Sequence, residues 1–548
     1  MSIYDITPHA RQSQASPSIS LEKGAYRMRA PLQRSKPKAR HDSRPSRDGI
    51  RAAIRYEKQM AVIVIFLVCA TVTCFAAAYY LFTTRWDTPT PSHTTVPFSD
   101  TYAHPRPQVV DFNLSANKML QDADSEERFM AYLPHSGFHN QRIAFENALV
   151  LSRLLNRTLL VPPVRLGKPL FYAPYENLKE MLVNTSKTEI RHCRLYVSRT
   201  HLAPEECAEY FQYTDVPWKW LVDLSGIEAH QKLLERWDFS DDWLYGTMEL
   251  SDLDVFVVRD MDRDTYGFQD FISLSGTQTR KYRRMIHLST LAHRSERILS
   301  LGTLFGTSRL HLRNPANLQL RKEIRTQMAR FSPFLGDVAR NIRTDLGRDY
   351  LGAHVRLGDG IFEDDAEDNV RTIWWKLVHG ALGFGLEDSI RLEHSFTGSI
   401  ARPPLDLPLD WDPQTYAAHR LQFPFSKTST LSCRSPLHSD PRLMRFNAPL
   451  YISTDSNDPH NDPRLHPILS TFSCIFFLSD FPERLAPLDP LHSSLDGLAL
   501  KPFLEPLLDA LVVARSSWVV GTEGSTFSRF VEDVLWRLHH GYEIVSKG

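Results

Sequence analysis

The chain has 548 residues, 42% of them hydrophobic, and its 64 Lys and Arg balance its 64 Asp and Glu. This length exceeds that of a usual single domain, so we expect two ordered domains plus additional segments. The neutral total conceals an asymmetry, because residues 1–60 hold 13 Lys and Arg against 5 Asp and Glu. The remainder is correspondingly acidic, which excludes a basic nucleic-acid-binding body, and no nucleic acid is expected as a partner.

The N-terminal region indicates a membrane anchor. Residues 1–60 are rich in Ser, Pro, Arg and Gln and predict a disordered, basic cytosolic tail. The 22 residues of segment 61–82 carry no charge and are long enough to cross a bilayer as a helix, the alternative being a buried core helix. Because basic residues precede it, the N-terminus should be cytosolic. We expect a single-pass type II signal-anchor protein of the Golgi or endoplasmic reticulum membrane, with its body in the lumen.

A lumenal body would be oxidised and glycosylated. Three N-glycosylation sequons begin at Asn113, Asn156 and Asn184. Four cysteines follow the membrane segment, and Cys193–Cys207 is the preferred disulfide, with two buried free thiols as its alternative. Cys433 and Cys474 are the remaining pair, whose connectivity the sequence alone does not fix.

The body divides into a spacer and two halves. Residues 83–125 form a Pro-rich, extended stem. We expect Rossmann-like α/β domains over 126–340 and 341–548, because short apolar strands alternate with helices in both. The stretch 398–445 is rich in Pro, Ser and Asp and predicts a long loop insertion in the second domain.

Both halves show strand, loop and helix in succession. In the first, a strand over 129–133, a loop over 134–141, a helix over 143–155 and a strand over 158–161 form one β-loop-α-β unit. The second half has strands at 350–355, 449–453, 474–478 and 518–520, and helices at 503–514 and 529–538. This pattern is typical of parallel sheets.

Three loops at strand ends carry the candidate chemistry: Gly137–Arg142, His354–Asp359 and Gly521–Ser528. Ligands of doubly wound sheets bind at the carboxyl ends of the strands, where helix N-termini favour phosphate groups. The guanidinium of Arg356 matches phosphate oxygens bidentately, whereas its structural alternative is an ion pair with Asp359. These loops together favour a phosphate-containing ligand over a purely structural arginine.

The same residues resemble the GDP-fucose protein O-fucosyltransferase family, in a divergent, fungal-type form. The segments that carry the resemblance are 132–142 with 154–163, the His-x-Arg motif at 354–359, Tyr451–Ser456 and Gly521–Ser528. They occur in the family's order between residues 129 and 538. The resemblance implies a GT-B-like fold, in which two Rossmann-like domains face a donor cleft. It also implies inverting transfer of fucose from GDP-fucose to a protein or glycan hydroxyl, with no cofactor and no metal.

The resemblance also implies roles for individual residues. Arg356 would bind the diphosphate and stabilise the departing GDP, and Asn140 would face the phosphate or the sugar. Asp455 would meet the guanine. The expected donor-binding residues are Gly137, Phe138, His354, Gly358, Asp359, Asp455, Ser525, Thr526 and Phe527. A fixed guanidinium agrees with this chemistry, because negative charge develops as a diphosphate departs.

The catalytic base is an open question at this point. The first loop offers His135, Ser136 and His139 but no carboxylate, whereas some relatives carry Glu near the position of Ser136. His139 stands where relatives commonly have Gly. We keep the donor phosphate and the loop histidines, His139 and His135, as candidate bases, alongside a structural role for His139.

Two other functions compete with this interpretation. A metal-dependent GT-A glycosyltransferase could use Asp252 and Asp254, or the later pairs 260/262 and 262/264, to hold a divalent cation. Interleaved arginines favour an ion-paired surface there. The second competitor is a non-catalytic lumenal binding protein on a transferase fold, against which the retention of Arg356 and Asp455 counts.

Overall fold

The computed structural model describes residues 20–21, 24–25, 108–112, 127–261, 265–272, 281–347, 349–358, 360–398, 403–404 and 431–545. The described residues from 108 onward belong to one compact unit. The predicted membrane segment 61–82 lies outside the described residues, as do Asn113, Asp359 and most of the predicted insertion. Within the described ranges, no helix combines the length and the apolar character needed to span a bilayer.

The first half is built on a parallel sheet of five strands. Its strands are β4 (Phe129–Ala131), β5 (Thr158–Val161), β8 (Leu233–Glu235), β9 (Val255–Val258) and β12 (Ile298–Leu301), in the order β8-β5-β4-β12-β9. The central strands are runs of buried apolar residues, as expected when helices cover both faces of a parallel sheet. The order reverses at β4, because β5 lies on one side of it and β12 on the other.

The helix that follows β4, α3 (Phe138–Leu154), starts five residues earlier than the predicted start at Ile143. Pro134 and Gly137 are the helix-disfavouring residues of the expected loop, and α3 begins directly after the second of them. The helix ends before Asn156, whose φ of +49° is left-handed. Most of its residues are buried, so α3 is a central core helix.

The second half has a parallel sheet of four strands. These are β14 (Leu351–Val355), β15 (Leu450–Thr454), β16 (Ile475–Phe476) and β18 (Trp518–Gly521), in the order β16-β15-β14-β18. All four lie at the predicted positions, which confirms a mixed α/β fold with a second parallel sheet. Here the order reverses at β14, because β15 and β18 flank it.

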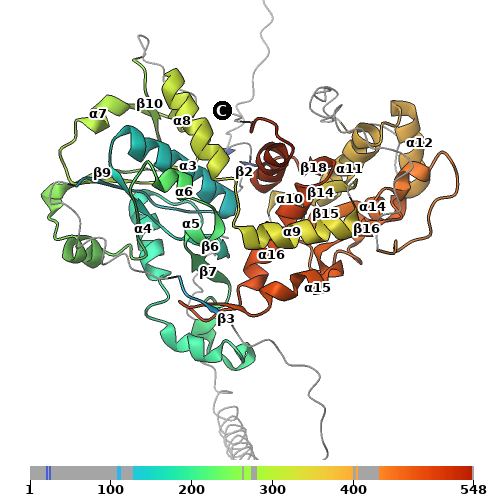
Figure 1. The fold of residues 1–548 in the computed structure, drawn as a ribbon, viewed down its shortest axis with the longest axis horizontal. Helices are drawn as coiled ribbons and strands as arrows, with labels where there is room; N and C mark the ends of the chain where they lie inside the picture. The colour runs from blue at the N-terminus through green and yellow to red at the C-terminus, as the bar shows by residue number, and fades with distance from the viewer. Residues whose placement is uncertain are drawn as a thin grey trace, which may run out of the picture. The chain divides into compact units, whose positions relative to one another are not determined.

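Helices of the second half cover this sheet. The predicted helix over 503–514 is α16 (Lys501–Val513), and α9 (Pro333–Leu346) packs along it (Figure 1). The predicted domain boundary at residue 340 therefore falls inside α9, a helix that packs on the second half. Other helices are α4 (Tyr175–Asn184), α8 (Pro315–Gln327), α11 (Ala366–Trp375), η6 (Lys376–Ala381), α12 (Leu386–Thr397), α14 (His466–Thr471), α17 (Thr526–Arg529) and η11 (Phe530–Trp536).

Smaller sheets surround the two main ones. β10 (Tyr266–Gln269), β11 (Arg284–His287) and β13 (Leu310–His311) are parallel, and β6 (Val164–Gly167) pairs antiparallel with β7 (Tyr213–Val216). In the region of the predicted tail, β1 (Ser20–Leu21) pairs with β2 (Gly24–Ala25).

Part of the predicted stem is ordered. Residues of β3 (Gln108–Val110) pair in parallel with β17 (Leu491–Ser493), and Phe112 is 3% exposed against the ring of Trp220. The assignment of 83–125 to an extended spacer is therefore wrong for residues 108–112. A strand this short gives no periodicity signal among prolines, and its partner lies almost 400 residues away.

A buried charge cluster holds α3 against α8, which lie side by side in Figure 1. The carboxylate of Glu146 on α3 lies 2.7 Å from the guanidinium of Arg325 and 3.4 Å from that of Arg321. Burial acts to raise the pKa of Glu146, but Arg325 and Arg142 outweigh it and lower the pKa to about 2. The carboxylate is thus ionised, and it fixes the helix whose N-terminus is a candidate phosphate site.

The preferred Cys193–Cys207 pairing is confirmed, and a Cys433–Cys474 bond, which the sequence left open, is formed as well. Cys193 and Cys207 are joined by a disulfide with Cα atoms 5.5 Å apart, and Cys433 is bonded to Cys474. The first bond links η1 (Arg191–Tyr196) to η3 (Glu205–Cys207).

Candidate functional site

The loop after β14 is tied to both neighbouring strands. The backbone N–H of Arg356 donates to the hydroxyl of Thr522, which follows β18, over 2.9 Å. On the other side, the carboxylate of Asp455 accepts from the N–H groups of Leu357, at 2.7 Å, and Gly358, at 3.0 Å. A Cβ at Gly358 would lie 2.7 Å from that carboxylate, so the close approach requires glycine.

Arg356 has a carboxylate partner, and it is Asp455. The Nε of Arg356 lies 3.2 Å from Oδ2 of Asp455, and about a third of the arginine side chain is exposed. The alternative ion pair with Asp359 is not tested, because Asp359 lies outside the described residues. The resemblance assigns Asp455 to the guanine. In this structure its carboxylate instead accepts hydrogen bonds from the backbone of Leu357 and Gly358 and pairs with Arg356. It therefore positions the arginine at the end of the sheet.

The end of β18 is bonded directly to His354. Nδ1 of His354 lies 2.7 Å from the hydroxyl of Ser528, which also accepts from the N–H of Thr522 over 3.1 Å. Ser525 caps α17 by accepting from the N–H of Ser528 over 3.2 Å. The ring of Phe527 lies 5.2 Å from that of His354. The predicted segments 354–358 and 521–528 are thus one bonded unit, with Thr526 at the start of the helix.

His354 is a neutral, structural member of this unit. Burial, with the charge of Arg356, lowers the pKa of its imidazole to about 3. Its 6% exposure and its bond to Ser528 leave it holding β14 to the turn after β18. A neutral ring at this position adds no positive charge beside Arg356.

The N-terminus of α3 presents unpartnered polar atoms. Gly137 is its N-cap and supplies no side-chain cap, and the first-turn N–H groups of a helix lack intrahelical partners. Nδ1 of His139 and Oδ1 of Asn140 are buried without a hydrogen-bond partner in the described part of the chain. Buried polar groups are normally paired, so the side-chain oxygen of Asn140 suits a polar ligand.

Phe530 brings this helix end to the second half. Its ring, fully buried, stacks on His139 at 4.7 Å and lies 5.8 Å from Phe138 and 5.9 Å from Phe527. The guanidinium of Arg142 lies over the same ring at 5.5 Å. All three predicted loops therefore meet, two by hydrogen bonds and the third through Phe530.

The geometry disfavours the histidines as catalytic bases. Burial, reinforced by Arg142, lowers the pKa of His139, and its ring is stacked on Phe530. His135 is held between Ser136, at 2.7 Å, and Thr303, at 2.6 Å, and burial lowers its pKa to about 3. Both imidazoles are weak bases in these surroundings.

Ser136 has a strained backbone, with φ of +65°. The N–H of Ser136 donates to the carbonyl of Leu170 over 2.5 Å, and the Gln141 amide donates to the Ser136 carbonyl over 2.9 Å. The same amide bridges to the carbonyl of Arg165. Gln141 therefore fixes the turn that precedes α3.

Sequence reasoning missed a lysine and a glutamate beneath β18. Nζ of Lys376 on η6 donates to the carbonyl of Gly521 over 3.3 Å and lies 3.6 Å from Glu523. Burial raises the pKa of the half-buried Glu532, on η11, to about 7 against the opposing effect of Lys376. Both elements are π-helical, a form common at functional sites. Glu532 lies four residues beyond Ser528, on the same helix face, but nothing in the local sequence points to Lys376.

A cavity of about 300 Å³ opens at the carboxyl ends of β4, β5 and β8. Residues that line it include His135, Ser136, Gln141, Arg165, Trp237 and Asp496. Two ion pairs line it, since Arg165 lies 3.2 Å from Asp215 and Lys187 lies 2.6 Å from Asp496, and Arg191 and Asp238 add one charge of each sign. The cavity is thus polar and near neutral, and it adjoins the α3 loop, whereas its described lining includes no residue of loop 354–358.

Two aspartates of the GT-A alternative, Asp254 and Asp260, have other partners. Asp254 forms a capping box with Ser251, and Asp252 lies on the same short helix. Asp260 is 2% exposed, accepts from the N–H of Thr303 over 2.8 Å and lies 3.4 Å from Arg309. Asp262 and Asp264 lie outside the described residues. Asp260 is therefore a core residue of the first half.

Two predicted glycosylation sites lie at the surface. Asn156 follows α3 and is exposed, and Asn184, the last residue of α4, is also exposed. Thr185 and Ser186 of the second sequon line the cavity. Glycosylation of Asn156 and Asn184 stays a prediction.

Comparison with known proteins gives short and distant similarities. No family model matches the chain. O-fucosyltransferase 30 from Arabidopsis thaliana is 42% identical over 55 residues, which are 10% of this chain and 11% of that protein. Structures of POFUT1 align over 77% of this chain. The complex with GDP-fucose has 10% identity, a TM-score of 0.31 and 96% of its chain covered. The complex with GDP has 12% identity, a TM-score of 0.32 and 98% covered. Because these values are low, the function has to be inferred from the site of this chain.

Proposed function

We propose that the chain is a glycosyltransferase that transfers fucose from GDP-fucose to a hydroxyl of a protein or glycan acceptor. The reaction inverts the configuration of the anomeric carbon of fucose and uses no metal. The fold is GT-B-like. The proposal is supported by the plant relative that is 42% identical over 55 residues, which is named an O-fucosyltransferase. Segment 61–82 is proposed to anchor the enzyme as a type II protein in the Golgi or endoplasmic reticulum membrane.

The observation that carries the proposal is the position of two motifs at topological switch points. The strand order of the first sheet reverses at β4, which leads into Gly137 and α3, and that of the second reverses at β14, which leads into Arg356. Open α/β sheets bind ligands in the crevice at such points. The chain thus offers a helix N-terminus from one half and a guanidinium from the other, joined through Phe530.

These groups suit the departure of a nucleoside diphosphate. Arg356, held by Asp455, would stabilise the charge that develops on the leaving phosphate. The first turn of α3, with Asn140, would bind the phosphate or the sugar. Ser525, Thr526 and Phe527 would line the donor site beside His354. With both loop histidines weakly basic, the acceptor proton is proposed to pass to a donor phosphate oxygen.

The cavity beside Ser136 is proposed to receive the acceptor. Ser136 and Gln141 line it and also flank His139 and Asn140, so an occupant would approach the α3 terminus. Its size suits a sugar or an extended side chain. Trp237→Ala should raise the acceptor KM several-fold and leave GDP-fucose binding unchanged, as measured by initial rates and calorimetry. If the parent and Trp237→Ala had the same KM for the acceptor, the proposal that the acceptor binds in this cavity would be contradicted.

The central test is calorimetry of the full chain with GDP-fucose, GDP-mannose and UDP-sugars. We expect binding of GDP-fucose, and Arg356→Ala should weaken it by at least tenfold, because a charge-assisted phosphate contact is lost. Arg442→Ala is the matched control, since Arg442 is an exposed arginine of the same half, and should bind normally.

Transfer should fall further than binding does. Arg356→Ala is expected to lower kcat/KM by about a hundredfold or more, because the guanidinium acts most strongly on the departing GDP. Binding of UDP-sugars without GDP-sugars, or unchanged GDP-fucose binding by Arg356→Ala, would contradict the proposal. Loss of transfer in chelator would instead favour the GT-A mechanism.

A further inference from the structure

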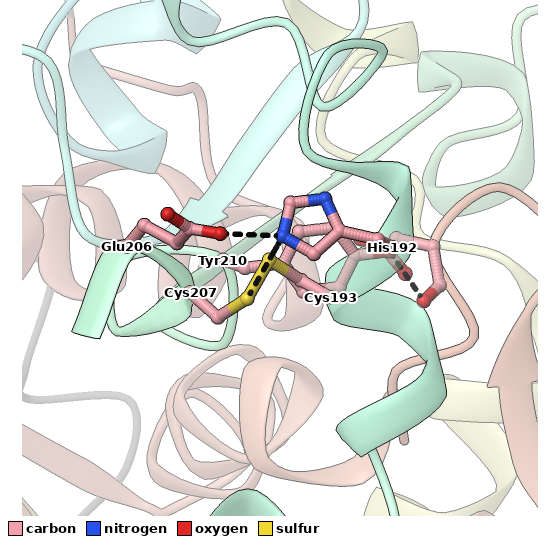
Figure 2. The surroundings of a disulfide bond; sticks show 6 residues. His192, Cys193, Glu206, Cys207 and Tyr210 are labelled. Carbon is pink, nitrogen blue, oxygen red and sulfur yellow. Dashed lines mark hydrogen bonds and ion pairs between the residues drawn. A yellow bond between two sulfur atoms is a disulfide. The ribbon is translucent and has the colours of Figure 1, made fainter. Parts of the chain in front are cut away.

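A histidine lies against the Cys193–Cys207 disulfide. Nε2 of His192 is 3.7 Å from Sγ of Cys193 and 3.8 Å from Sγ of Cys207. The same nitrogen lies 2.8 Å from Oε1 of Glu206 (Figure 2). The imidazole, both sulfurs and the carboxylate therefore converge on one point, and three of these residues form a group with metal-ligand spacing.

The spacings match those between ligands of tetrahedral zinc. With Zn–S of about 2.3 Å and Zn–N of about 2.1 Å, a nitrogen and a sulfur ligand are roughly 3.6 Å apart. His192 already stands at this distance from both sulfurs. Only the sulfurs have to separate, to roughly 3.8 Å in a tetrahedral site. Glu206 can supply the fourth ligand by a small rotation.

We propose that, when the disulfide is reduced, Cys193, Cys207, His192 and Glu206 bind one zinc ion. Two thiolates and an imidazole form a donor set that selects zinc over magnesium or calcium. The cysteines are fully buried, whereas the side chains of His192 and Glu206 are 46% and 64% exposed. The ion thus reaches the site from solvent past the histidine and rests against the sulfurs.

The chemistry balances with a dithiol as the reductant. The dithiol gives two electrons and two protons, the S–S bond breaks to two thiols, and the dithiol closes to its own disulfide. Zinc then displaces one proton from each thiol and accepts the lone pair of Nε2 from a neutral imidazole. Disulfide and zinc are therefore alternative cross-links between η1 and η3.

The cross-link supports contacts with the second half. Tyr210, packed beside both cysteines, donates its hydroxyl to the carbonyl of Asp496 over 2.8 Å. Arg194, next to Cys193, donates to the carbonyl of Ser494 over 3.3 Å. Asp496 also lines the cavity. Zinc would hold this segment on the loop after β17 when the disulfide is open.

The test measures zinc bound by the full chain after reduction with a dithiol and removal of the reductant. The reduced chain should bind one more zinc ion than His192→Ala does, and Co²⁺ in place of zinc should give the thiolate charge-transfer absorption. Glu206→Gln should weaken binding by about tenfold. His201→Ala, which changes an exposed histidine of the same segment, should bind as the parent does.

A second measurement separates a site from loose thiol chelation. Zinc should raise the Tm of the reduced parent and not that of reduced His192→Ala, because binding to the folded state stabilises it. Equal zinc stoichiometry in the parent and in His192→Ala would overturn the proposal, since that zinc would belong to other thiols. The proposal would also be overturned if zinc left the Tm of the reduced parent unchanged.

Discussion

Asp455 shows how one carboxylate fixes a reactive loop. It accepts two consecutive backbone N–H groups and pairs with Nε of Arg356, so the arginine and its loop move as one body. Preorganised charge is worth more to catalysis than mobile charge, because it costs no reorganisation during the reaction. The carboxylate thus acts on the reaction through the arginine.

Substitutions at Asp455 should separate charge from shape. Asp455→Asn keeps an acceptor for the loop but loses the ion pair, so we expect weaker GDP-fucose binding with little change in stability. Asp455→Ala also leaves the buried N–H of Leu357 unpaired and should lower the free energy of unfolding by about 1–3 kcal/mol. Calorimetry and urea unfolding measure the two effects. Asp440→Asn, an exposed control, should change neither, and equal stability of both Asp455 variants would contradict this account.

His139 offers a test between a catalytic and a packing role. Its ring stacks on Phe530, and its lowered pKa makes it a weak base. His139→Phe keeps the stack and should retain transfer within about threefold, whereas His139→Ala should lose more through lost packing. Initial rates decide between the roles. If His139→Phe bound GDP-fucose normally but lost transfer, the imidazole would be the base.

At the scale of elements, helix α16 carries a carboxyl group into the core. Oδ1 of Asp509 accepts a hydrogen bond of 2.5 Å from the hydroxyl of Tyr451, which lies on β15. Asp509 is 8% exposed. Burial raises the pKa of Asp509 to about 7 despite this hydrogen bond. The folded protein is therefore more stable when the carboxyl of Asp509 is protonated, because burying the ionised form is unfavourable.

The sign of the resulting pH dependence follows from the raised pKa. Asp509 makes its full contribution to the free energy of unfolding below its unfolded pKa of 3.8. This contribution is lost as pH rises through about 7. A shift of three units corresponds to roughly 4 kcal/mol. Asp509→Asn should therefore match the parent near pH 4 and exceed its unfolding free energy at pH 8. Urea unfolding across this range measures it, and a variant less stable at pH 8 would disprove the assignment.

Patterns within single segments were sufficient to predict most helices and strands, but not the contacts between segments far apart in the sequence. Strands β14, β15 and β18 lie within one residue or so of their predicted bounds, because each is an apolar run ended by turn residues. The loops at their ends were predicted for the same reason. In contrast, the pairing of Arg356 with Asp455, the position of Lys376 beneath Gly521 and the strand β3 depend on residues far apart in sequence. No period or motif within one segment specifies such contacts.

At the scale of the whole molecule, Phe530 links the two halves. It is completely buried among Phe138, His139, Phe331 and Phe527. Aromatic rings of this size dominate the energy of buried contacts. The residues that hold the halves together are therefore neighbours of those proposed to bind the donor.

Phe530→Ala should affect stability and activity together. Loss of a fully buried phenyl group is expected to cost about 3–5 kcal/mol in unfolding free energy. The α3 terminus should also lose its alignment with loop 354–358, which raises the KM for the donor. Urea unfolding and initial rates measure these effects, with Phe171→Ala, a 69% exposed phenylalanine, as the control. A change in stability without a change in KM would show that Phe530 does not align the site.

Strand β3 determines how the body is attached to whatever precedes it. The chain enters through Gln108, pairs in parallel with β17 of the second half, and then buries Phe112 against Trp220 of the first. A shortened chain that begins after residue 112 would therefore lose one strand pairing to the second half and one aromatic contact to the first.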